Sequence, residues 1–161
     1  MRWEEFSTAC PEIAERAEER FRRDELVTLG TLRADGSPRI SPCEVDFAAG
    51  HLFLGMMWRS RKAFDLLRDP RIVVHSLQAE REPTEGDIKL YGSATEILQP
   101  ELREMYRDAI RARIGWAPDE PEYHLFALDV QEAGYLSFPD RVVTTWDASR
   151  GSRHPPFPEV P

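Results

Sequence analysis

The sequence has little cysteine, no long apolar run and a deficit of positive charge. Two cysteines among 161 residues are too few for a disulfide framework, and neither has neighbours at zinc-ligand spacing. No apolar run approaches the roughly 18 residues of a membrane span. Acidic residues outnumber basic ones by 29 to 21, so the net charge is −8. This charge argues against nucleic acid or an anionic membrane as a partner, because both are bound mainly through Lys and Arg.

Several catalytic signatures are also missing. The chain has no P-loop, no G-x-G-x-x-G turn and no G-x-S-x-G elbow. The four histidines lie far apart in the sequence, so we expect no metal site; they are His51, His75, His124 and His154. The charged N-terminal stretch lacks a signal-peptide core, which predicts a cytoplasmic protein.

What remains indicates one domain over residues 1–161, mainly β with inserted helices. Short alternating apolar segments joined by turns predict six or seven antiparallel strands in a barrel. We expect these strands at 26–33, 39–47, 51–56, 71–77, 87–98 and 123–130, with 134–138 as an extension and 142–146 as a possible seventh. Helices are expected at 11–23, within an N-terminal helical segment 1–24, at 60–68 and at 100–114, and residues 150–161 form an extended tail.

The start of the 60–68 helix has an unusual charge pattern. Ser60 suits an N-cap, which places Arg61 and Lys62 in the first turn, with Arg59 just before it. Cations there oppose the helix dipole at a cost of about 0.3–1 kcal/mol each, whereas the 100–114 helix has acids early and bases late. A bound anion would reverse this cost, so the pattern predicts a phosphate site. A solvated basic turn is the alternative.

A resemblance favours the phosphate site. The runs LVTLGTLRADGSPRISPCEVDF and HLFLGMMWRSRKAFDLLRDPRIVVHSL resemble the pyridoxamine 5′-phosphate oxidase-like family of FMN-binding split β-barrels. The segment Ser60-Arg61-Lys62-Ala63, followed by Asp69-Pro70 at the family's interval, is the more specific part. The resemblance covers residues 25–78 closely and 87–98 more loosely.

The resemblance implies a set of FMN contacts. Arg61 and Lys62 would pair with the phosphate, and Ser60 would donate a hydrogen bond to it. Three segments would lie near the flavin ring or its ribityl chain: Gly55, Met56 and Met57; Ser41, Pro42 and Cys43; and Gln78. The family also implies a homodimer that encloses the cofactor between subunits, with the C-terminal residues Trp146, Arg150 and Arg153 near the partner's pocket.

The function expected from the resemblance is transfer of hydride or electrons between FMN and a small organic substrate. The family's C-terminal substrate signature is matched only in composition, so oxidation of vitamin B6 is not expected, and no catalytic proton donor is assigned. One alternative is a 5-deazaflavin coenzyme, favoured if Arg59, Arg150 and Arg153 lead out of the pocket. Another is a non-catalytic flavin or haem carrier. Cys43 also has a plain interpretation as a core residue, and His75 as a core or interface histidine.

Overall fold

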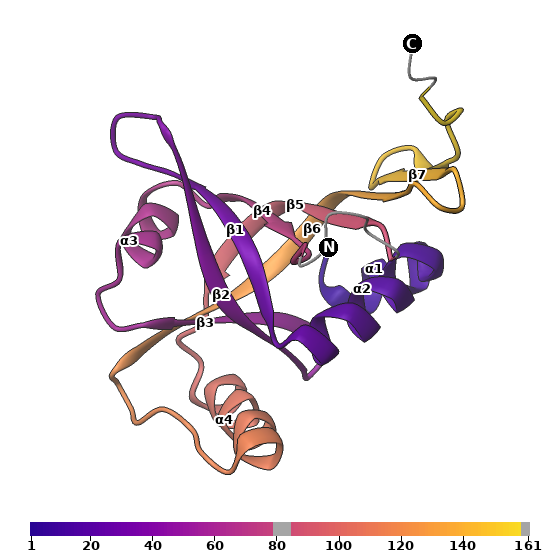
Figure 1. Cartoon of the computed structure of the whole chain (residues 1–161). Coiled ribbons are helices and arrows are strands. Elements are labelled where there is room, and N and C mark those ends of the chain that lie inside the picture. Colours follow the sequence, from indigo (N-terminus) through magenta and orange to yellow (C-terminus); the bar gives the residue numbers. More distant parts are fainter. Residues whose placement is uncertain (79–84, 159–161) are drawn as a thin grey trace.

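The structure is a computed structural model that describes residues 1–78 and 85–158. Within this range, eight antiparallel strands form one sheet in the order β3-β2-β1-β4-β5-β6-β7-β8, and pairing of β3 with β6 closes the first six into a barrel (Figure 1). The strands are β1 (Leu26–Leu32), β2 (Pro38–Ala48), β3 (His51–Met57), β4 (Arg71–His75), β5 (Asp87–Glu96), β6 (Tyr123–Ser137), β7 (Val142–Asp147) and β8 (Gly151–Arg153). The predicted antiparallel barrel is confirmed.

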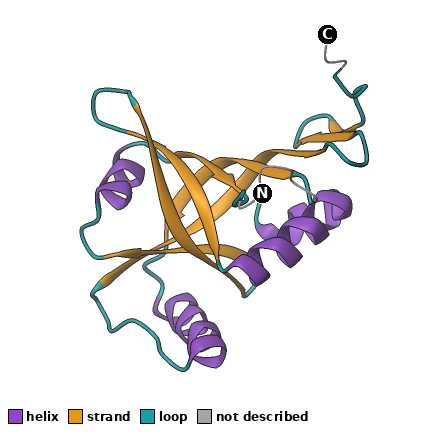
Figure 2. Ribbon diagram, in the orientation of Figure 1, coloured by secondary structure: helices purple, strands orange, loops and turns teal. Residues whose placement is uncertain are grey.

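The helices lie outside the barrel, as Figure 2 shows. They are α1 (Trp3–Ala9), α2 (Pro11–Asp24), α3 (Arg61–Arg68) and α4 (Pro100–Ile114). The predicted helix starts at Pro11 and Pro100 are observed, and α4 ends at Gly115 in the left-handed conformation, as a C-terminal glycine permits. The N-terminal helical segment is broken at Cys10, whose φ of −143° is not helical.

The sixth strand differs from the prediction. It runs for 15 residues without interruption, where the sequence suggested two segments, because one half pairs with β3 and the other half with β7. The expected irregularity at Gly92 is observed as a shift in the β5–β6 register. A Cβ atom at Gly92 would lie 1.9 Å from the carbonyl oxygen of Asp129, so only glycine fits there.

Two apolar clusters hold the fold together. The main cluster fills the barrel and continues beneath α1 and α2, where Phe6 and Phe21 are fully buried. A smaller cluster joins the outer face of β3 and β6 to α4 through Phe53, Tyr106 and Leu125. The remaining helix, α3, packs on β1, β3 and β5. The α1–α2 pair, α3 and α4 therefore each cover a different part of the barrel (Figure 1).

The C-terminal strand was not expected. The sequence suggested an extended tail from residue 150, and three of its residues pair with β7 as β8. Residues 159–161 of this tail lie outside the described range. No helix of the described chain is long and apolar enough to cross a membrane.

Candidate functional site

The turn between β3 and α3 carries the predicted phosphate site. The Ser60 amide donates to the Met57 carbonyl oxygen at 3.1 Å, and the Phe64 amide donates to the Ser60 carbonyl oxygen at 3.1 Å. Between Met57 and Ser60, Arg59 has a φ of 58°, which a residue with a side chain adopts at a cost. Ser60 takes the extended conformation of an N-cap, as predicted.

The hydroxyl group of Ser60 is the first unusual feature of this turn. It makes no capping hydrogen bond to the helix. Its oxygen is buried and has no partner among the described residues. Leaving such a group unpaired costs on the order of 1–3 kcal/mol. A ligand oxygen in hydrogen-bond contact with Ser60 would remove this cost.

A cationic hollow adjoins the turn. It has a volume of about 340 Å³ and lies between α3 and the β1–β2 hairpin. Four arginines and two aspartates, Asp35 and Asp65, line it, so positive charge is in excess. We call the arginines the α3 cluster: Arg33, Arg39, Arg61 and Arg68. Arg39 was not singled out from the sequence. The alternation along β2 could have indicated it, because alternation places Arg39 on the same face of the strand as Ser41 and Cys43.

The Asp65 carboxylate forms ion pairs with two of these arginines. It is 2.6 Å from the Arg39 Nε and 3.3 Å from an Arg68 nitrogen, and it accepts a hydrogen bond from Thr31 at 3.1 Å. Burial works to raise the pKa of Asp65, but the bonds from Arg39, Thr31 and Arg68 outweigh it and lower that pKa below its ordinary value. No ion pair in the described part of the chain involves Arg61.

Lys62 points to a different place from Arg61. Its ammonium group donates to the Pro42 carbonyl oxygen on β2. The structure thus joins Lys62 to the Ser41–Cys43 segment, as expected if both serve one cofactor. Arg61 instead faces the hollow beside Arg39. The two predicted phosphate ligands therefore lie on different sides of the helix start.

The segment expected along the flavin ring is largely covered. Met56 is buried inside the barrel. The Tyr106 hydroxyl of α4 stands over Gly55, 1.9 Å from where a Cβ atom would be. Only Met57, with 81% of its surface exposed, offers its side chain to a ligand. Side-chain contact from Met56 is not available in this arrangement, because strand alternation turns Met56 inward.

Cys43 and His75 fit their plain interpretations. The Cys43 thiol donates to the Gly55 carbonyl oxygen at 3.2 Å, and burial raises its pKa to about 12. A thiol with so high a pKa is a poor nucleophile at neutral pH. The half-buried His75 holds its Nδ1 at 2.6 Å from the Ser76 carbonyl oxygen. Among residues 1–78 and 85–158, no three His, Cys, Asp or Glu side chains are placed to hold a metal ion.

Two further predicted contacts lie away from α3 within one chain. Gln78 follows the far end of β4, where its amide donates to the Gly86 carbonyl oxygen at 3.0 Å. Trp146 is buried and packs edge-on against Phe6 at a centroid distance of 5.0 Å. Its strand, β7, lies on the opposite side of the molecule from α3 (Figure 1). Arg150 and Arg153 line a hollow of about 300 Å³ beside Trp146.

The sequence did not point to the pair formed by His124 and Glu96. The His124 Nδ1 lies 2.7 Å from a Glu96 carboxylate oxygen, while its Nε2 is buried without a partner in the described chain. Trp58 stacks on the imidazole at 4.6 Å and 15°. The two partners are 28 positions apart, so no local motif marks them; only the pairing of β5 with β6 brings them together.

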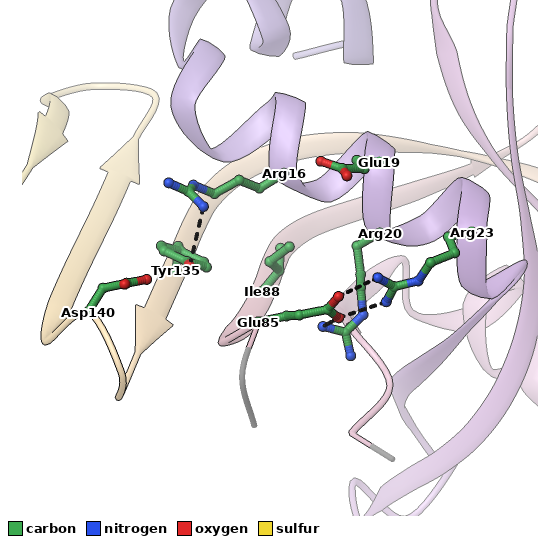
Figure 3. A pocket seen from close by; sticks show the side chains of 8 residues that line it. All are labelled: Arg16, Glu19, Arg20, Arg23, Glu85, Ile88, Tyr135 and Asp140. Atoms are coloured by element: carbon green, nitrogen blue, oxygen red, sulfur yellow. Dashed lines mark hydrogen bonds and ion pairs between the residues drawn. The ribbon is translucent and has the colours of Figure 1, made fainter. Parts of the chain in front are cut away.

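A second arginine cluster lies on α2, and Figure 3 shows it. This α2 cluster consists of Arg16, Arg20 and Arg23, which border a hollow of about 260 Å³. Glu85 lies between Arg20, at 2.8 Å, and Arg23, at 2.5 Å. Arg16 covers the Tyr135 ring at 4.6 Å. Every arginine of this cluster thus has a partner in the chain, and the cluster ties α2 to the start of β5.

Comparison with known families agrees with this geometry. The family model described as pyridoxamine 5′-phosphate oxidase matches residues 13–137, which include the barrel and all of α3. The chain belongs to this family. No curated protein matches the chain.

Solved structures share the fold of this pyridoxamine 5′-phosphate oxidase family member. An FMN-binding, pyridoxamine 5′-phosphate oxidase-related protein from Nostoc punctiforme superposes with a TM-score of 0.69 at 18% identity, over 92% of this chain and 96% of that one. HutZ, the heme storage protein from Vibrio cholerae, gives 0.61 at 21% identity, over 81% and 92%.

A heme-binding protein from Mycobacterium smegmatis gives a TM-score of 0.64 at 21% identity and covers 91% of this chain. The present chain spans 58% of that protein's length. At these identities the similarity concerns the fold, which therefore carries proteins described as binding FMN and proteins described as binding heme.

Proposed function

We propose that the chain binds FMN, with the phosphate at the start of α3. The observation that carries this proposal is the buried, unpartnered Ser60 hydroxyl, which belongs to the residue just before Arg61, and Arg61 lines the hollow together with Arg39. A phosphate supplies acceptor oxygens for the hydroxyl, and its charge of about −1.5 to −2 suits two guanidinium groups. The first-turn amides of α3 add further donors. The residues present therefore fit the phosphate end of FMN.

The proposed activity is transfer of hydride or electrons between this flavin and a small organic substrate. The flavin would supply the redox chemistry. Arg39, Arg61 and Ser60 would bind and orient the phosphate, and Asp65 would hold Arg39 in place. Lys62 would stay against β2, where its charge lies beside the Ser41–Cys43 segment. The cytoplasmic location expected from the sequence stays a prediction.

A second copy of the chain would complete the site. Gly55 is covered by α4, so one chain offers the ring little beyond Met57. Four residues in register form a row on the outer face of β2, β1, β4 and β5: Ile40, Gly30, Val73 and Tyr91. Ile40 is 77% exposed. An apolar row of this kind on a sheet face supports a homodimer.

Carriage of haem is the second candidate, supported by the heme-binding and heme-storage proteins that share the fold. A 5-deazaflavin coenzyme gains less support. Its extended anionic tail would be served by Arg59, Arg150 and Arg153 only if they led out of one pocket. Within one chain the last two lie on or beside β8, on the far side of the barrel from α3, so they would reach a pocket at α3 only from the partner subunit.

Titration of the purified protein with FMN tests the first proposal. We expect the two-banded flavin spectrum and micromolar or tighter binding. The variant Arg61→Ala/Lys62→Ala should bind FMN about tenfold more weakly, because the charge-assisted phosphate contact of Arg61 is lost and the positive charge of Lys62 beside the Ser41–Cys43 segment is removed. Arg16→Ala, in the α2 cluster, is the matched control and should bind like the parent. Unchanged affinity in the double variant would refute the phosphate assignment, and a Soret band would favour haem.

Sedimentation analysis tests the dimer. We expect a dimer in the parent and a monomer in Ile40→Asp, because a buried unpaired carboxylate opposes association. Thr95→Asp, on an exposed position of β5, is a control that should stay dimeric. A parent that sediments as a monomer with FMN bound would contradict the proposed interface.

A further inference from the structure

His124 is the buried polar residue that the proposed cofactor site leaves unused. It faces Met56 across the β3–β6 pairing and is only 5% exposed. Its Nδ1–H donates to Glu96, since a carboxylate can only accept. Its Nε2 is buried and has no hydrogen-bond partner among the described residues. Such an arrangement is costly, so the fold gains something from a histidine here that an apolar residue would not give.

The His124 imidazole contacts one residue before Ser60 and one residue after it. Trp58, two residues before Ser60, stacks on it at 4.6 Å with an interplanar angle of 15°. Phe64, four residues after Ser60, meets it edge-on at 6.4 Å. Phe64 also lines the hollow of the α3 cluster. One ring thus contacts the chain on both sides of the proposed phosphate ligands.

The turn needs such support. Arg59 is held in the left-handed region, which a non-glycine residue leaves unless its surroundings retain it. The Trp58 indole, just before Arg59, is half exposed, and it stacks on His124. This stack limits the positions that Trp58 can take. The Glu96 carboxylate fixes the plane of the imidazole in turn. Leucine would fill the space but would present no flat face of fixed orientation.

We propose that His124 and Glu96 are positioning residues for the phosphate site. They hold Trp58 and Phe64, and through them they place Ser60 and Arg61 for the anion. Neither residue touches the phosphate itself. This inference rests on the proposed function, because it assigns the pair a role in the same site.

The test compares variants of the two stacked histidines. His124→Leu removes both the flat ring and the bond to Glu96, and His124→Phe keeps the ring alone. His51→Phe is the matched control, because His51 stacks on Phe53 at 5.3 Å and lies at the other end of β3. Calorimetry gives the dissociation constants for FMN and for inorganic phosphate. Incorporated 5-fluorotryptophan reports on Trp58 by ¹⁹F NMR, with its signal assigned from Trp58→Phe.

We expect His124→Leu to shift the Trp58 resonance and to weaken the binding of both FMN and phosphate about tenfold. The reason is that Ser60 and Arg61 would no longer be held in position to contact the phosphate. His124→Phe should lose only about threefold, since the stack is restored. His51→Phe should match the parent. A His124→Leu protein that shifts the Trp58 resonance yet binds phosphate like the parent would overturn the proposal.

Two further outcomes separate this inference from the proposed function. If His124→Leu fails to fold, Glu96→Gln and His124→Phe decide the matter, and parent affinity for phosphate in both would overturn the positioning role. A parent that binds phosphate but not FMN would refute the FMN proposal, while the phosphate constants of the variants still decide the role of His124. A parent that binds neither would refute both.

Discussion

The α2 cluster and the α3 cluster contain the same residue type and differ in how it is neutralised. In the α2 cluster, Glu85 bridges Arg20 and Arg23, and the third arginine covers a tyrosine ring. In the α3 cluster, Asp65 serves Arg39 and Arg68, while no ion pair of the described residues reaches Arg61. Arginines alone therefore do not mark a site. The signal is the positive charge and the buried hydroxyl that the chain leaves without partners.

The largest expected difference concerns the acid at the centre of each cluster. Asp65 is 5% exposed, so Asp65→Ala leaves Arg39 half-buried and uncompensated, which should cost about 3 kcal/mol of folding free energy. Glu85 is 48% exposed, and Glu85→Ala should cost below about 1 kcal/mol. Urea unfolding of both variants measures this. If both variants lost the same unfolding free energy, the different burial of Asp65 and Glu85 would not translate into different stability.

A smaller effect should appear on acidification. The pKa of Asp65 is lower in the folded protein than in the unfolded chain, so its contribution is present above the unfolded value and is lost as pH falls through the folded one. Between neutral pH and about pH 3, the parent should lose more stability than Asp65→Asn, by roughly 1 kcal/mol. Urea midpoints along this range give the difference. Parallel curves for the two proteins would contradict the assignment.

Local chemistry accounts for the parts of the site that the sequence predicted. The serine cap, the following bases and the Asp69-Pro70 stop all lie within residues 60–70, and so α3 was predicted with its first residue shifted by one. The hairpin and the alternation of β2 are local as well. They predict the strand that carries Ser41–Cys43, whereas the contact of this segment with Lys62 joins residues 20 positions apart and was not predicted.

Contacts between distant segments account for what the sequence missed. Arg39 joins the α3 cluster only because Asp65, 26 positions later, binds its guanidinium. Tyr106 covers Gly55 because α4 packs back onto β3 from a later part of the chain. Trp146 packs against Phe6 within one chain because β7 pairs with the end of β6, and its expected place near the partner's pocket stays a prediction. None of these follows from spacing or periodicity.

The smallest expected effect is the response of the two clusters to salt. Exposed ion pairs weaken when added salt screens them, whereas buried pairs keep most of their attraction. Raising the salt concentration should therefore reduce the contribution of Glu85 by a few tenths of a kcal/mol and leave that of Asp65 nearly unchanged. The measurement is the stability difference between the parent and each of Glu85→Gln and Asp65→Asn, at low and high sodium chloride. A salt-sensitive Asp65 difference would mean that water reaches the Arg39 pair. The hollow beside Arg61 would then be a solvated surface, and the main contrast between the two clusters would disappear.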